Sequence, residues 1–97
     1  MPEIKLREIS ESLEKVARSV KDAPDPSRTG QAIQNARVLI GAYFAGRGRV
    51  ASLEKLDSEL GIWESKLAVI LREPAGRQGI AKHVNHWVEE LRKLNVG

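Results

Sequence analysis

The stretch Leu53–Arg72, LEKLDSELGIWESKLAVILR, decides the fold that the sequence predicts. Leu53, Leu56 and Leu60 recur at the spacing that places side chains on one face of a helix. Gly61 follows directly, and a glycine at that position can adopt a positive φ and turn the chain without a Cβ clash. The stretch therefore predicts a helical hairpin over residues 53–72, with two short helices broken at Gly61.

The same stretch resembles the helix-turn-helix of DNA-binding regulators, in which apolar residues flank a glycine at fixed offsets. Those offsets are met here by Leu56, Leu60, Ile62, Leu67 and Ile70. The resemblance covers residues 53–72 alone. It implies that exposed residues of the second helix would face the major groove, namely Glu64, Ser65, Lys66 and Arg72. The alternative interpretation is a plain helical hairpin within a small bundle.

Residues 3–22 form a strongly periodic amphipathic segment. Its apolar stripe advances by alternating steps of three and four residues and consists of Leu6, Ile9, Leu13, Val16 and Val20. Such a stripe packs either on the core of its own domain or against a second copy of the chain as a dimer interface. Both interpretations stay open from the sequence.

The segment that follows, DAPDP, is the clearest break in the chain. Its two prolines disfavour a helix, so helix 1–22 is expected to be hinged at residues 23–26. Asp25 and Pro26 suit the cap and the first residue of the next helix, and Ser27 or Thr29 is the alternative cap for a slightly later start. We expect that helix over residues 27–45. Because residues 38–45 carry no charge, we expect it to be the central helix, with Gly41 allowing another helix backbone to approach closely.

A last helix is expected over residues 79–94, after Pro74 has ended the preceding one. No stretch alternates long enough to predict a strand. The sequence as a whole, residues 1–97, therefore predicts a single all-α domain, a compact bundle of about five helices.

The composition restricts the possible functions. The chain has no cysteine, which excludes disulfides and thiolate metal sites, and no apolar run long enough to cross a membrane. Its charged N-terminus lacks the core of a signal peptide, so we expect a cytoplasmic protein. His83 and His86 are the only histidines, and with Glu90 they do not complete a metal site. Since no catalytic motif is present either, we expect neither metal, nor cofactor, nor enzymatic activity.

Basic residues gather near two glycine-containing turns. The chain carries 16 basic and 13 acidic residues, a net charge of +3, but no acid lies within residues 45–52 or 74–88. If these turns meet in space, they form one basic edge that binds DNA, or RNA as a variant, by neutralising phosphates. The edge is expected to comprise Arg47, Arg49, Arg72, Arg77 and Lys82. Ser65 and Lys66 would join these nucleic-acid contacts only if the second helix of residues 53–72 enters a DNA groove.

A second function is left open by the same residues. The stripe from Leu6 to Val20 and the uncharged residues 38–45 are also typical of a protein–protein interaction module, such as an adaptor, an inhibitor or a subunit of a larger complex. Such a module would dock to a protein partner or form a homodimer, and would not need nucleic acid.

Overall fold

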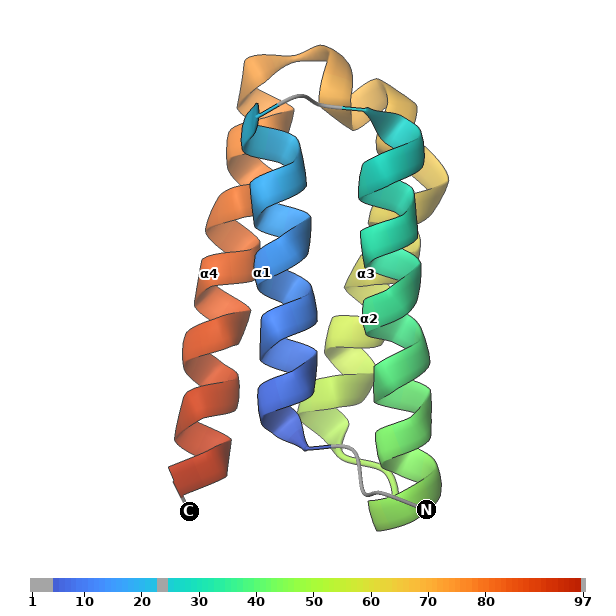
Figure 1. Ribbon diagram of the computed structural model, residues 1–97, viewed down its shortest axis with the longest axis vertical. Helices are drawn as coiled ribbons and strands as arrows, with labels where there is room; N and C mark the ends of the chain where they lie inside the picture. Colours follow the sequence, from blue (N-terminus) through green and yellow to red (C-terminus); the bar gives the residue numbers. More distant parts are fainter. Residues whose placement is uncertain (1–4, 23–24, 97) are drawn as a thin grey trace.

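The computed structural model of the protein describes residues 5–22 and 25–96. These residues form four α-helices and no strand: α1 Leu6–Asp22, α2 Pro26–Arg47, α3 Ala51–Arg72 and α4 Pro74–Val96 (Figure 1). The predicted all-α class is confirmed. The expected number of about five helices is wrong for the described residues, because the 53–72 stretch belongs to a single helix.

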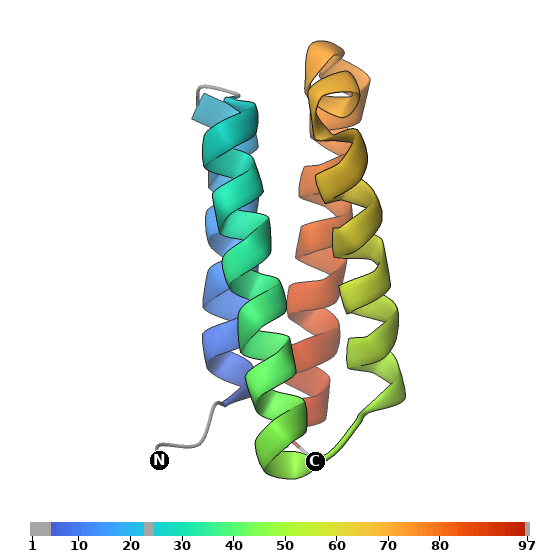
Figure 2. The ribbon, with the colours of Figure 1, turned by 90° about the vertical axis from the view of Figure 1, so that its right-hand side faces the viewer.

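The helices form an antiparallel bundle in which consecutive helices run in opposite directions (Figures 1 and 2). Both α1 and α3 pack against α2 and α4, so the four helices enclose one shared core. The bundle measures 37 × 22 × 20 Å. The prediction that α2 is central is wrong. This helix is one of four that surround the shared core, and its Val38 side chain is 64% exposed. Gly41 has no atom of another helix within 4 Å of a Cβ position, so no close helix approach occurs there.

Each helix contributes one apolar face to the core. The buried apolar residues are Ile9, Leu13, Val16 and Val20 of α1; Ile33, Ala36 and Ile40 of α2; Leu53, Leu56, Leu60, Leu67 and Leu71 of α3; and Ile80, Val84, Trp87, Val88 and Leu91 of α4. The predicted stripe of α1 is therefore buried inside the chain's own bundle, with Leu6 packed at its edge. This burial agrees with the core interpretation and removes the stripe from the surface on which a dimer interface would form.

The predicted break at Gly61 is absent, because α3 continues through this residue. The helix departs from helical geometry later, at Lys66, where φ is −113° and ψ is 15°. Just before this kink, the Ser65 hydroxyl donates to the carbonyl of Ile62 over 3.0 Å. In a regular helix the Ile62 carbonyl would accept a hydrogen bond from the backbone N–H of Lys66. Serine hydroxyls that bind a backbone carbonyl in this way bend helices. The stretch 53–72 is therefore one kinked helix rather than a hairpin.

The start of α2 agrees with the sequence. Asp25 has extended backbone angles and accepts a hydrogen bond from the backbone N–H of Ser27 over 3.0 Å, while Pro26 is the first helical residue. The helix ends at Gly48, whose φ of 86° is unfavourable for other residues and whose N–H donates to the Phe44 carbonyl over 2.8 Å. The expected hinge at 23–26 lies partly outside the described residues.

Helices α3 and α4 are joined by a single residue, Glu73, in an extended conformation. Pro74 begins α4, so this helix starts five residues earlier than predicted, and the expected turn at 74–79 is helical. Proline suits the first helical position, where its missing N–H has no partner to lose. The sharp crossing brings Gly76 so close to Ile70 that a Cβ would overlap the Ile70 carbonyl.

Two glycines of α4 therefore respond differently to alanine. We expect Gly76→Ala to lower the free energy of unfolding by about 2 kcal/mol or more, because backbone atoms must move apart. Gly79 has no such neighbour within 4 Å, so Gly79→Ala should stabilise by up to about 1 kcal/mol through helix propensity. Urea denaturation followed by circular dichroism measures both. Equal stabilities of the two variants would contradict this account of the α3–α4 crossing.

Candidate functional site

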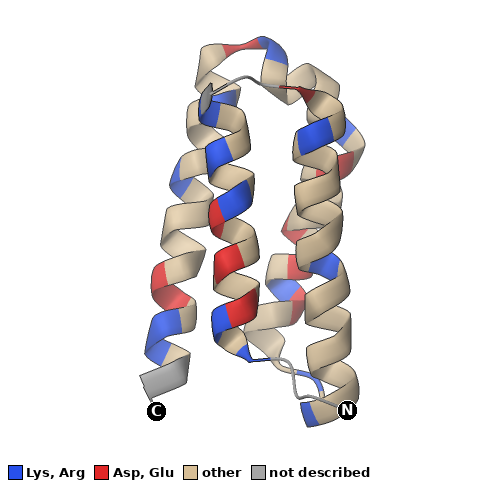
Figure 3. Ribbon diagram, in the orientation of Figure 1, with Lys and Arg blue, Asp and Glu red and all other residues tan. Residues whose placement is uncertain are grey.

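The two predicted basic turns lie at opposite ends of the bundle. Arg47 and Arg49 are at the end where α2 meets α3, whereas Arg72 and Arg77 are at the end where α3 meets α4 (Figure 3). Between these ends runs α3, of which the 15 residues before the kink at Lys66 alone span about 22 Å. The premise that the two turns meet is therefore wrong, and the five residues of the predicted edge, Arg47, Arg49, Arg72, Arg77 and Lys82, do not lie together.

Some of the predicted nucleic-acid residues hold helix ends instead. Arg77 donates from Nη1 to the Leu71 carbonyl over 2.9 Å and so satisfies a carbonyl at the end of α3. Arg49 lies 3.7 Å from the Glu54 carboxylate in an exposed ion pair. As described above, the Ser65 hydroxyl is engaged with the backbone at the kink. These contacts give three of the predicted residues a local structural role.

A charged cluster that the sequence did not indicate ties α2 to α3. The guanidinium of Arg37 donates from Nε to Asp57 over 3.0 Å and from Nη1 to Glu64 over 2.9 Å. The hydrogen bond to Asp57, followed by the one to Glu64, raises the pKa of Arg37 above its ordinary value. Glu64, a candidate for groove contact by resemblance, is therefore engaged within the chain.

The guanidinium of this cluster packs against Gly61. A Cβ at Gly61 would lie 3.4 Å from the guanidinium carbon of Arg37, at the edge of ordinary van der Waals contact. Asp57, Gly61 and Glu64 follow one another at the spacing of one helix face, so the guanidinium lies across the glycine between two carboxylates. This acid–glycine–acid spacing was readable in the sequence, but its basic partner is 20 residues from the nearer acid.

Aromatic residues join α3 to α4. The indole N–H of Trp87 donates to the Glu59 carboxylate over 2.6 Å, and the rings of Trp63 and His83 lie 6.0 Å apart. Across the described residues, no group of three or more His, Cys, Asp or Glu side chains is placed to hold a metal ion. The two tryptophans thus serve helix packing.

The outer surface of α2 is uncharged along most of its length. Its exposed side is lined by Gln31, Gln34, Val38, Ala42 and Ala45. The helix contains no acid, and Figure 3 shows long uncharged segments between its basic residues. A helix that meets water on one side normally carries charged or polar residues there. Between Arg28 and Arg47 the outer side of α2 meets this requirement with glutamine and asparagine and not with exposed charges, and it also exposes the apolar Val38.

A groove of about 560 Å³ runs between this side of α2 and the neighbouring α1. It is lined by Glu8, Glu11, Ser12, Lys15, Arg28, Gln31, Ala32, Asn35, Val38 and Leu39. Apolar and uncharged residues come from α2, and charges come mainly from α1. We call the surface formed by this groove and the exposed sides of α1 and α2 the α1–α2 face.

The charges of α1 are ordered along the helix. Glu8 and Glu11 lie in its first half, and Lys15 and Arg18 in its second half, all four exposed. Figure 3 shows this order as acids on the lower part of α1 and bases on its upper part, above the basic residue at its start. In the described contacts, Glu11 binds Arg7 through an exposed ion pair of 3.2 Å. At positions 8, 11, 15 and 18, α1 is therefore negative toward its start and positive toward its end, with the exposed Arg7 beside the two acids.

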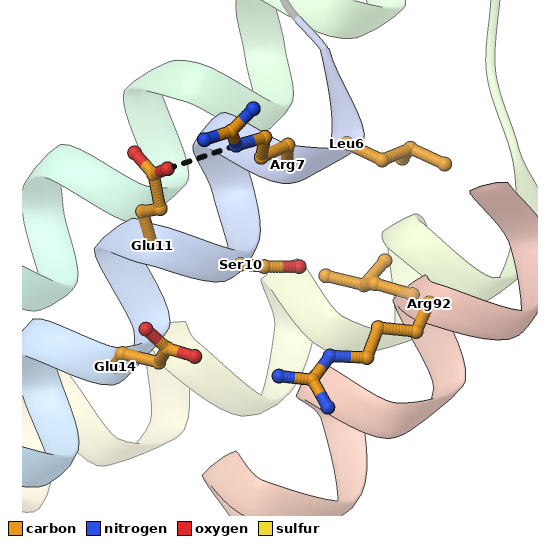
Figure 4. Close-up of a pocket in the computed structure, with 7 residues that line it drawn as sticks. Leu6, Arg7, Ser10, Glu11, Glu14 and Arg92 are labelled. Carbon is orange, nitrogen blue, oxygen red and sulfur yellow. Dashed lines mark hydrogen bonds and ion pairs between the residues drawn. The ribbon is translucent and has the colours of Figure 1, made fainter.

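A smaller hollow of about 300 Å³ lies between α1 and α4 (Figure 4). Charged side chains from both helices enter it, among them Glu14 of α1 and Arg92 of α4. Its apolar lining is limited to Leu6 and Leu91. Such an open, charged hollow lacks the convergent apolar walls of a small-molecule site.

Comparisons with known proteins found no relative. No protein-family model matches the chain, and neither the curated proteins nor the solved structures contain a significant match. The resemblance to helix-turn-helix regulators therefore stays a prediction. Separately, none of the described helices is long and apolar enough to span a membrane.

The Arg37 cluster makes a testable contribution to stability. We expect Arg37→Met to lower the free energy of unfolding by about 1 kcal/mol, because it leaves two half-exposed carboxylates on one face of α3 without their shared cation. Arg28→Met, on the exposed part of the same helix, should change it by less than about 0.5 kcal/mol. Urea denaturation at low and high salt measures both. An equal effect of the two substitutions would contradict a specific role for the cluster.

Proposed function

We propose that this protein is a helical protein–protein interaction module that docks through the α1–α2 face. The observation that supports this most is the uncharged outer side of α2, in which Val38 is 64% exposed. The centres of protein interfaces are depleted of charged residues, with polar and charged groups at their rim. The α1–α2 face has this arrangement, because the uncharged side of α2 adjoins the charged side of α1.

Folding does not account for the composition of this outer side. The core contacts of α2 are made by Ile33, Ala36 and Ile40, which are completely buried on the opposite side of the helix. Charged residues in place of Gln34 or Ala42 would remain in water and leave these contacts unchanged. Their absence favours a surface that is covered when the protein works.

Site-specific photo-crosslinking tests this proposal. A p-benzoylphenylalanine at position 38 lies on the α1–α2 face, and one at position 85 lies on α4, which is diagonally opposite α2 in the bundle. In cells that express the full chain, we expect discrete protein adducts from position 38 and few from position 85. Adducts that form equally from both positions, or not at all, would contradict docking through this face.

A second candidate function keeps one observation in its favour. At the end of the bundle where α3 meets α4, the last turn of α1 and the first turn of α2 also lie close by (Figure 1). This end carries exposed bases from all four helices: Lys21, Arg28, Arg72 and Lys82. Contact with nucleic acid is therefore proposed for this end alone, where bases can neutralise phosphates, and not for the predicted edge.

Measurements of binding to a DNA duplex show which end of the bundle contacts nucleic acid. We expect the double variant Arg72→Ala/Lys82→Ala to weaken binding at low salt, and to reduce the slope of log K against log salt by about 2, because two phosphate contacts are lost. Arg47→Ala/Arg49→Ala, at the other end, is the matched control and should leave both quantities unchanged. An electrophoretic or fluorescence titration measures them. Absence of duplex binding at low salt would eliminate this candidate.

A further inference from the structure

We infer that the α1–α2 face binds a second copy of this chain, face to face and with the helices of the two copies antiparallel. This inference rests on the proposed function, because it names the partner of the same face. It depends on the order of charges along α1, on the register between α1 and α2, and on the size of the face.

The charges of α1 are complementary to themselves under a two-fold rotation. Consider an axis that lies in the interface, perpendicular to the helices and level with the midpoint between Glu11 and Lys15. It places Glu11 of each copy opposite Lys15 of the other, and Glu8 opposite Arg18. Each acid thus meets a base, whereas two parallel α1 helices would place like charges at the same level. Opposed charges of this kind set the orientation of an isologous interface.

The same axis suits α2. The hydroxyls of Ser19 and Thr29 lie 2.9 Å apart, which sets the register of the antiparallel α1–α2 pair. Both helices rise by the same distance per residue, so six residues before Ser19 and six residues after Thr29 lie at one level. Leu13 of α1, which is midway between Glu11 and Lys15, is therefore level with Asn35 of α2. The axis therefore passes close to Asn35.

Around this axis, the side chains of α2 match in size and polarity. Val38 of each copy comes level with Ala32 of the second copy, beside the groove that Ala32 and Leu39 line. The two Asn35 amides come together at the centre and can exchange hydrogen bonds. The exposed side of α2 brings no charge into this centre, so no ion must be buried without a partner.

The face is large enough for a weak, reversible dimer. At 1.5 Å per residue α1 is about 26 Å long, and the bundle is 22 Å across, so the face offers a projected area of roughly 560 Å² per copy, below the ~800 Å² of a standard interface. Pairing requires Glu11 to exchange its bond to Arg7, but that ion pair is exposed and contributes little to stability. A second copy therefore fits the face without rearrangement of the core.

Sedimentation velocity of the full chain at low salt tests the dimer. We expect a reversible dimer that weakens as salt is added, since exposed charges are screened. Val38→Arg places a charge at the centre of the face and should weaken dimerisation by about tenfold or more. Val69→Arg is the matched control: Val69, on α3, is 68% exposed and Val38 is 64% exposed. A monomer at all concentrations, or a dimer that Val69→Arg disrupts and Val38→Arg does not, overturns the inference.

Charge reversal tests the pairing itself. Glu8→Lys/Glu11→Lys makes the charges at positions 8, 11, 15 and 18 all positive, and Lys15→Glu/Arg18→Glu makes these four charges all negative. Each variant alone should be monomeric, while a mixture of the two should form a heterodimer. Circular dichroism establishes that both variants are folded. If the mixture does not associate although both variants are folded, the antiparallel pairing is wrong.

The photo-crosslinks at position 38 separate this inference from the proposed function. An adduct with the mass of two chains supports the dimer. An adduct with a different protein, together with a monomeric sedimentation profile, overturns the dimer and leaves the interaction module standing. Absence of any specific adduct from a monomeric chain removes both.

Discussion

The burial of apolar side chains along α3, on both sides of its kink at Lys66, is the constraint on which the rest of the structure depends. Leu53, Leu56, Leu60, Leu67 and Leu71 all point into the shared core, and this requires helical geometry to persist through Gly61. A turn at Gly61 would have carried Leu67 and Leu71 away from the other helices. Because these side chains are large and buried, their transfer from water outweighs the roughly 1 kcal/mol that a glycine costs inside a helix.

The continuity of α3 decides which charges can act together. A helix of 22 residues holds the two connections that it links at opposite ends of the bundle, so the arginines of those connections cannot cooperate. Gly61 has a different place from the one expected, since it lies inside α3 and the Arg37 guanidinium packs across it between Asp57 and Glu64. Gly61 is therefore part of a contact between α2 and α3 and not a turn.

The separation of stability from recognition follows from the same architecture. The buried face of each helix holds the bundle together, while the outer sides of α1 and α2 contribute almost nothing to the core. Substitutions of the exposed residues on these outer sides, such as Gln34 and Val38, are therefore expected to leave the core intact. An uncharged outer surface on α2 carries a risk of nonspecific association, which is removed if a partner covers it.

Local periodicity in the sequence by itself determined the all-α class, the amphipathic α1, and the start of α2 at Asp25 and Pro26. These features depend on neighbouring residues, whose spacing and capping chemistry act within a few turns. Only the tertiary structure decided that Gly61 receives Arg37, that α4 begins at Pro74, and that the basic turns lie apart. The uncharged stretch of α2 was visible in the sequence, but its outward position was not. The physical reason is that a glycine, a proline or a charge acquires its role from segments that reach it only when the chain has packed.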